Sequence, residues 1–209
     1  LVGDSASNVF AGNETTVPIT LDEMIYHAKS VVKAVKRALV VVDLPFGTYQ
    51  SDPQEALRSA IRIMKESGAH AVKLEGGIEV SESATRIINA GIPVMGHLGL
   101  TPQSIYKFGT YNVRGADKVE ADQLIKDAKN LEQIGCFASV LEKIPTQLAK
   151  KVSNKTKFPL IGIGAGNHVD GQVLVLHDML GLSDGHNPKF AKSFFSKGDT
   201  IEQAIRNYI

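Results

Sequence analysis

The stretch AVKLEGG, residues 71–77, shows how this chain is built. It has the apolar character of a buried strand, yet it carries a lysine and a glutamate two positions apart. Alternate side chains of a strand point to the same face, so Lys73 and Glu75 lie together, opposite to Val72 and Leu74. Such a pair indicates either a structural ion pair or a site built where the strand ends.

Six other apolar runs share this character, and most are rich in Val, Ile and Leu with little polar alternation. They are LVGD (1–4), ALVVVD (38–43), PVMGH (93–97), FASVLE (137–142), PLIGIGAG (159–166) and QVLVLH (172–177). Runs of this kind are typical of parallel strands that are covered on both faces. Helix patterns lie between them, with start signals such as Thr20 followed by Glu23, and Asp52 followed by Pro53.

Alternating strands and helices predict an α/β fold with a parallel sheet. About seven strands is one short of a (β/α)8 TIM barrel. The chain also opens directly on LVGDS, without an initiator Met. We therefore expect a TIM barrel whose first strand and helix are absent from this chain, with residues 1–209 forming a single, N-terminally incomplete barrel domain.

The overall composition is that of an ordinary globular protein. The 209 residues are 43% hydrophobic and 22% charged, with a formal net charge of +1. A charge this close to zero gives no reason to expect a nucleic-acid or membrane partner. No apolar run approaches the ~20 residues of a spanning helix. Cys136 is the single cysteine, so no internal disulfide forms, which favours a cytoplasmic location.

Five of the predicted strands end on an ionisable side chain: Asp4, Asp43, Glu75, His97 and Glu142. The carboxyl ends of the strands are the face where barrels and open α/β sheets build their active sites. Each residue alone also has a structural interpretation, as a helix or turn cap, a hydrogen-bonded core histidine or half of an ion pair. Several carboxylates at one mouth, however, repel each other unless a cation or the lysine neutralises them.

The oxygen-rich character of these side chains favours Mg²⁺ over Zn²⁺, because Mg²⁺ takes one or two carboxylates together with waters and substrate oxygens. An acidic substrate that chelates the metal, most simply an α-keto acid, would suit such a mouth, and Lys73 would answer its carboxylate. GIGAG (162–166) is not the spacing of a dinucleotide-binding loop, so close backbone packing or close approach to a ligand is the favoured interpretation.

Several motifs, taken in order, carry a specific resemblance. They are LVGDS, VVDLPFG, AVKLEGG, GIPVMGHLGLTPQS, VLEKIP, IGIGAG and DGQVLVLHDMLGL. With them the chain resembles the ketopantoate hydroxymethyltransferase family along nearly its whole length. The resemblance implies a (β/α)8 barrel in large homo-oligomers, typically decamers. It also implies transfer of a hydroxymethyl group from 5,10-methylenetetrahydrofolate to 3-methyl-2-oxobutanoate, with Mg²⁺ and through an enolate, to give 2-dehydropantoate for pantothenate biosynthesis.

The same resemblance implies roles for individual residues. Asp4, Asp43 and Glu75 correspond to the magnesium site of the family. Asp4, Ser5, Asp43 and Lys73 correspond to its keto-acid site. Glu142 corresponds to its catalytic base, and His97 is expected close by as an auxiliary group. The implied partners are two small molecules, the keto acid and the folate.

Two alternatives stay open at this point. The first is another Mg²⁺-dependent α-keto-acid barrel, a carbon–carbon lyase or mutase of the isocitrate lyase or PEP mutase type. Such enzymes are expected to carry a reactive cysteine loop, whereas Cys136 lies at a strand start. The second is a non-catalytic scaffold or regulatory barrel, against which Lys73 and Glu142 count.

Overall fold

The computed structural model describes residues 1–182, 189–196 and 198–209. These residues form two compact units, Leu1–Gly171 and Gln172–Ile209. A single barrel domain over residues 1–209 stays a prediction.

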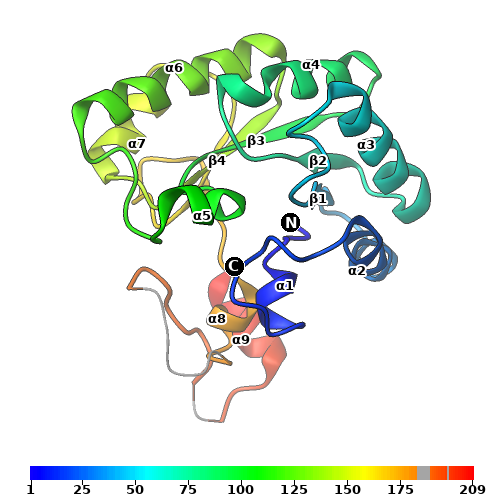
Figure 1. Cartoon of the computed structure of the whole chain (residues 1–209). Helices are drawn as coiled ribbons and strands as arrows, with labels where there is room; N and C mark the ends of the chain where they lie inside the picture. Colours follow the sequence, from blue (N-terminus) through cyan, green and yellow to red (C-terminus); the bar gives the residue numbers. More distant parts are fainter. Residues whose placement is uncertain (183–188, 197) are drawn as a thin grey trace. The chain divides into compact units, whose positions relative to one another are not determined.

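The first unit is built on a curled sheet whose strand order follows the sequence (Figure 1). The strands are β1 (Val41–Asp43), β2 (Ala71–Lys73), β3 (Val94–Gly99), β4 (Ala138–Glu142), β5 (Leu160–Ile163) and the two-residue β6 (Gly171–Gln172). The pairings from β1 to β5 are all parallel. A curled parallel sheet with helices between its strands is a half-barrel of the TIM type, which confirms the predicted fold class.

Helices connect the strands and cover the outer face of the sheet (Figure 1). The longer ones are α2 (Leu21–Ala34), α3 (Pro53–Ser67), α4 (Ser81–Asn89), α6 (Lys118–Ile134) and α7 (Thr146–Ser153). Short helices are α1 (Ala6–Val9), η1 (Ile78–Val80), η2 (Pro102–Ser104) and α5 (Ile105–Phe108). The predicted start signals are present, because Thr20 and Glu23 form a full capping box and Asp52 caps α3 ahead of Pro53.

The two faces of the sheet bury different side chains. Val72 and Leu74 belong to the main core, which packs between the strands and the helices. A separate small cluster fills the inner face: Val41, Ala71, Met95, Ala138 and Val140. Because side chains alternate along a strand, the positions two residues after these inner ones face the same way. Those positions carry Asp43, Lys73, His97 and Glu142, so the charged site continues directly from the apolar floor of the half-barrel.

Two apolar runs contribute less strand than predicted. LVGD pairs only through Val2, which forms an isolated parallel bridge to Val42 beside β1. QVLVLH contributes only Gln172 to β6, and its last residues begin the short helix α8 (Leu176–Met179). Apolar runs of this length do not separate a buried strand from a buried helical turn, which is why the pattern misled here.

The end of β3 also differs from the prediction. The strand continues past His97 to Gly99, so His97 lies within it rather than at its end. Gly99 has φ +93°, and a Cβ atom there would lie 2.2 Å from the carbonyl oxygen of Glu142. A side chain would therefore separate β3 from β4, and glycine keeps His97 and Glu142 on adjacent strands.

The GIGAG segment forms the turn after β5. Gly166 has φ +81°, and a Cβ atom there would lie 2.4 Å from Oγ1 of Thr146, at the start of α7. The close-packing interpretation of this motif is therefore supported.

In the second unit, Met179 and Leu180 at the end of α8 pack with Ala204 of α9 (Ile201–Tyr208). Thr200 and Gln203 form a capping box at the start of α9. Among the described residues, no helix combines the length and the apolar character that crossing a membrane requires.

Candidate active site

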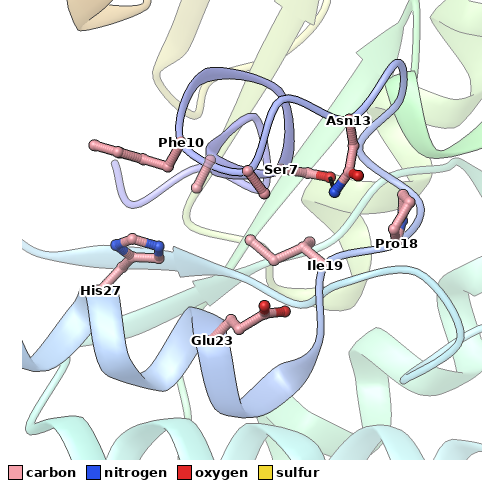
Figure 2. Close-up of a pocket in the computed structure, with 9 residues that line it drawn as sticks. Ser7, Phe10, Asn13, Pro18, Ile19, Glu23 and His27 are labelled. Carbon is pink, nitrogen blue, oxygen red and sulfur yellow. Dashed lines mark hydrogen bonds between the residues drawn. The ribbon is translucent and has the colours of Figure 1, made fainter.

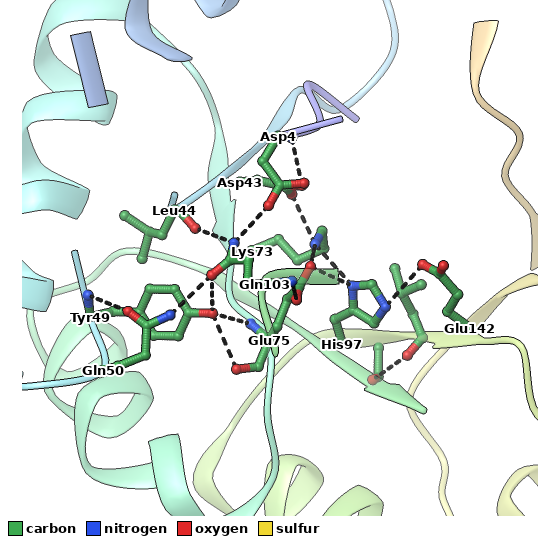
Figure 3. A network of polar contacts seen from close by, with 12 residues as sticks. Asp4, Asp43, Leu44, Tyr49, Gln50, Lys73, Glu75, His97, Gln103 and Glu142 are labelled. Carbon is green, nitrogen blue, oxygen red and sulfur yellow. Dashed lines mark hydrogen bonds and ion pairs between the residues drawn. The ribbon is translucent and has the colours of Figure 1, made fainter. Parts of the chain in front are cut away.

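The structure brings the predicted strand-end residues together in one buried cluster (Figure 3). Asp43 ends β1, Lys73 ends β2, Glu75 follows it by two residues, and His97 lies within β3. Asp4 precedes α1 and joins them through its main chain, whose N–H donates to Oδ2 of Asp43 at 3.2 Å. All five side chains are buried.

Glu142, at the end of β4, lies on the more open side of this cluster. Its side chain keeps 16% of its surface exposed, compared with 5% for the neighbouring His97. Glu142 is thus the cluster carboxylate to which an incoming molecule has the easiest access.

Lys73 is the cation at the centre. Its Nζ lies 3.1 Å from Oδ1 of Asp43 and 3.9 Å from Oε1 of Glu75. Burial by itself would lower the pKa of Lys73, but the carboxylates of Asp43, Glu75 and Asp4 together raise that pKa. The side chain therefore stays an ammonium ion. The charged face of AVKLEGG is explained by this position, where Lys73 meets carboxylates from three segments.

One lysine does not neutralise the carboxylates around it. Burial, and then the charge of Asp43, raise the pKa of Asp4 from 3.8 to about 7. Burial likewise raises the pKa of Glu75 well above its usual range, against the lowering effect of Lys73. Without a further cation the cluster thus holds protons that carboxyl groups normally lose at neutral pH.

The chemistry of Asp4 and Asp43 fits a small, hard divalent cation. Oδ1 of Asp43 is buried and faces Lys73, but it accepts no well-aligned hydrogen bond. Two adjacent carboxylates, with waters and substrate oxygens completing the shell, are a usual way to bind Mg²⁺. Within residues 1–182, 189–196 and 198–209, no three His, Cys, Asp or Glu side chains form a ready-made cage. Glu75, beside Lys73, stays a predicted ligand.

His97 is held as a neutral imidazole of one tautomer. Burial, and then the charge of Lys73, lower the pKa of His97. Its Nδ1 lies 3.1 Å from Nζ of Lys73. An ammonium group has only donors, so Nδ1 must be the acceptor and the ring proton must be on Nε2. Nε2 lies 3.4 Å from Oε2 of Glu142, longer than a good hydrogen bond and without the alignment of one.

Ser5 stands beside the two aspartates with its hydroxyl available. It is the N-cap of α1 but makes no capping hydrogen bond with its side chain. A Cβ atom on Gly3 would lie 3.1 Å from Oγ of Ser5 and 3.7 Å from Oδ2 of Asp43. The glycine of the LVGDS motif thus leaves room between the hydroxyl and the carboxylate.

Sequence reasoning missed two residues that organise the cluster, Gln103 and Tyr49. The hydroxyl of Tyr49 accepts a hydrogen bond from the main-chain N–H of Glu75 at 3.0 Å. The main-chain N–H of Gln103 donates to Oε2 of Glu75, also at 3.0 Å. The only available signal for Gln103 was its place just after a strand on the site's side. The segment TPQS indicated a helix start and nothing more.

A separate pocket of about 180 Å³ lies in the first unit, between α1 and α2 (Figure 2). Three of its polar side chains, those of Ser7, Asn13 and Glu23, are engaged with the surrounding chain. Oγ of Ser7 donates to the carbonyl of Thr15 and accepts from Nδ2 of Asn13, while Glu23 completes the capping box of α2. The acidic cluster gathers many more buried charged side chains than this pocket, and it is therefore the candidate active site.

Similarity to solved structures concerns the fold. The chain superposes on phosphonopyruvate hydrolase with a TM-score of 0.56 at 10% identity, covering 78% of this chain and 58% of that one. For 2,3-dimethylmalate lyase, a member of the PEP mutase/isocitrate lyase superfamily, the TM-score is 0.54 at 14% identity, with 76% and 55% covered. Both agree with a TIM-barrel-like architecture.

Similarity in sequence is far more specific. The family model described as ketopantoate hydroxymethyltransferase matches residues 1–209. The 3-methyl-2-oxobutanoate hydroxymethyltransferase of Flavobacterium johnsoniae is 68% identical over 208 residues, covering 100% of this chain and 76% of that protein. The enzyme of the same name from Porphyromonas gingivalis is 64% identical over 209 residues, with 100% and 77% covered. The chain therefore belongs to the ketopantoate hydroxymethyltransferase family of enzymes.

Proposed function

We propose that this enzyme transfers a hydroxymethyl group from 5,10-methylenetetrahydrofolate to 3-methyl-2-oxobutanoate, giving 2-dehydropantoate for pantothenate biosynthesis. The observation that carries the proposal is the cluster itself. Asp4 and Asp43 fit a divalent cation, Lys73 is a buried ammonium ion, and Glu142 is a partly exposed carboxylate on the same face.

The metal belongs to the carboxylates of the cluster in this proposal. Asp4, Asp43 and Glu75 would hold Mg²⁺. When bound, Mg²⁺ would supply Lewis acidity, which makes the C3 proton of the keto acid easier to remove and stabilises the resulting enolate.

Lys73 and Ser5 are the residues for binding and orienting the keto acid. An ammonium group has three donors. Asp43 and His97 lie within 3.1 Å of Nζ, whereas Glu75 is 3.9 Å away, beyond hydrogen-bond distance. Lys73 thus keeps donor capacity for a substrate carboxylate, because Oδ1 of Asp43 accepts no well-aligned hydrogen bond from it, and the hydroxyl of Ser5 is available nearby.

Glu142 is the residue for accepting the C3 proton. The carboxylates of Asp4 and Asp43 would be engaged with the metal, and that of Glu75 is held by Lys73 and the main chain of Gln103. Glu142 lies 3.4 Å from Nε2 of His97, a neighbour that would help to orient its carboxylate. The enolate left after proton removal would then form a carbon–carbon bond to the one-carbon unit of the folate. Both bonds from that carbon to folate nitrogens break in the process, and one water supplies the hydroxyl oxygen and the protons that release tetrahydrofolate.

The isocitrate lyase/PEP mutase alternative rests on a shared fold and lacks support in the side chains. Cys136 is buried just before β4, at the opposite end of that strand from Glu142. Burial raises the pKa of its thiol to about 12, so it is an inert core group. It does not supply the reactive cysteine expected of such lyases.

The compartment and the assembly belong to the same proposal. A free, buried cysteine suits the reducing cytoplasm that we propose as the location. A homo-oligomer, with a decamer as the family expectation, stays a prediction.

Turnover tests the proposal directly. Purified enzyme given 3-methyl-2-oxobutanoate, 5,10-methylenetetrahydrofolate and Mg²⁺ should release tetrahydrofolate and 2-dehydropantoate in equal amounts. Omitting the keto acid, or chelating the metal, should stop both. Folate consumption without the keto acid, or cleavage of the keto acid in place of its extension, would contradict the proposed reaction.

A further inference from the structure

Gln103 is the most connected polar side chain of the cluster, and none of the roles assigned above depends on its side chain. It lies in η2, directly after β3, and only 4% of its surface is exposed. Figure 3 shows its amide between the aspartates and Tyr49. Its contacts reach the loops that follow β1 and β2 as well as the segment before α1.

Every hydrogen-bonding position of the Gln103 amide is used. Nε2 donates to Oδ2 of Asp4 at 2.8 Å and to the carbonyl of Leu44 at 2.9 Å. Oε1 accepts from the hydroxyl of Tyr49 at 2.7 Å and from Nε2 of Gln50 at 3.0 Å. A primary amide offers two N–H donors and two lone pairs, so nothing is left unpaired.

These partners allow only one orientation of the amide. In the flipped orientation Oε1 would face Oδ2 of Asp4 and the carbonyl of Leu44, which are both acceptors. Nε2 would then face the amide nitrogen of Gln50, which is a donor. The N–H that points at Asp4 is therefore fixed by groups on the far side of Gln103, away from the metal site.

The carboxylate of Asp4 needs this support because little else in the described residues orients it. It precedes α1, a helix of only four residues, and its side chain accepts a hydrogen bond from the Gln103 amide. A hydrogen bond to a buried carboxylate is also one of the stronger kinds, and removing its donor leaves the charge poorly solvated. The main-chain N–H of Gln103, independently of the side chain, holds Glu75.

We infer that Gln103 is a positioning residue of the metal site: its side-chain amide holds the carboxylate of Asp4 in the orientation that receives the cation. The inference rests on the proposed function only in taking Asp4 as a metal ligand. The Gln103 side chain itself contacts neither metal nor substrate in this account. Asp4 is the proposed metal ligand that this side chain contacts directly, because the contact to the carboxylate of Glu75 comes from the main chain of Gln103 and survives substitution.

The test measures binding of Mn²⁺ to otherwise metal-free protein, with no substrate present. Gln103→Leu removes the donor, while Gln103→Glu keeps the size of the side chain and turns an acceptor toward Asp4. Both should weaken Mn²⁺ binding at least tenfold, about 1.4 kcal/mol or more. Gln123→Leu, on the exposed face of α6, is the matched control and should leave the affinity unchanged. Circular dichroism and thermal unfolding identify any variant that fails to fold.

A double-mutant cycle separates positioning from general destabilisation. If Gln103 acts through Asp4, then Gln103→Leu should change Mn²⁺ affinity less than twofold once Asp4→Asn is present. Wild-type affinity in folded Gln103→Glu, or a full tenfold loss on top of Asp4→Asn, would overturn the inference. Because wild-type Mn²⁺ binding and wild-type turnover are measured separately, failure of the proposed reaction is distinguishable from failure of this inference.

Discussion

Glu142→Gln should abolish most exchange of the C3 hydrogen of 3-methyl-2-oxobutanoate with solvent deuterium, by about 10²–10⁴-fold, the usual size of general-base catalysis. Glutamine has nearly the shape of glutamate but does not take up a proton. Exchange requires no folate, so it isolates the proton transfer from the later bond formation. Binding of Mn²⁺ and of the keto acid should stay within about twofold, because Glu142 lies outside the aspartate pair in this account.

The matched control is Glu82→Gln, an exposed glutamate in the first turn of α4. It should exchange at the wild-type rate. Wild-type exchange in Glu142→Gln would remove Glu142 from the role of base. His97, whose Nε2 lies 3.4 Å from Glu142, would then be the next candidate.

Lys73→Met should destabilise the metal-free protein by about 3–5 kcal/mol at neutral pH, as removing one partner of a buried ion pair generally does. Lys73 is the one described cation among Asp43, Glu75 and Asp4, and methionine fills similar space without charge. Urea unfolding of the metal-free protein measures the change. Lys129→Met, at an exposed position of α6, is the control and should shift the free energy of unfolding by less than about 0.5 kcal/mol.

The loss in Lys73→Met should shrink as the pH falls. The pKa of Asp4 is raised from 3.8 to about 7 in the folded protein, so the folded state binds this proton more tightly than the unfolded state. The resulting stability is complete below pH 3.8 and is lost as the pH rises through about 7. Without Lys73, which lowers the pKa values of Asp4 and Glu75, both carboxyls hold protons to higher pH. A deficit of equal size at about pH 5 and about pH 8 would contradict this electrostatic account.

The repeating part of this structure could be predicted from the sequence. Parallel strands covered on both faces need continuous apolar runs, and the runs at 38–43, 71–75 and 137–142 each contain a strand of the sheet. Alternation along AVKLEGG also placed Lys73 opposite to Val72 and Leu74, as observed. Because parallel strands end at one edge, their terminal charges had to converge there.

The lateral connections of the site could not be predicted in this way. Gln103 joins Asp4, Leu44, Tyr49 and Gln50, and these partners come from loops whose conformation no periodicity describes. The tautomer of His97 likewise depends on the place of Lys73 on the adjacent strand. In QVLVLH, composition alone did not reveal that the chain leaves the sheet after Gln172.

The central claim is that the acidic cluster is where metal and keto acid meet. Anomalous diffraction from crystals soaked with Mn²⁺ and 3-methyl-2-oxobutanoate tests it most directly. The account predicts one strong peak at about 2.1 Å from carboxylate oxygens of both Asp4 and Asp43, the distance expected for a small, hard cation. The keto acid should chelate that ion, with its carboxylate toward Lys73 and C3 toward Glu142. A metal peak away from both aspartates, or a keto acid bound elsewhere in the protein, would contradict the account.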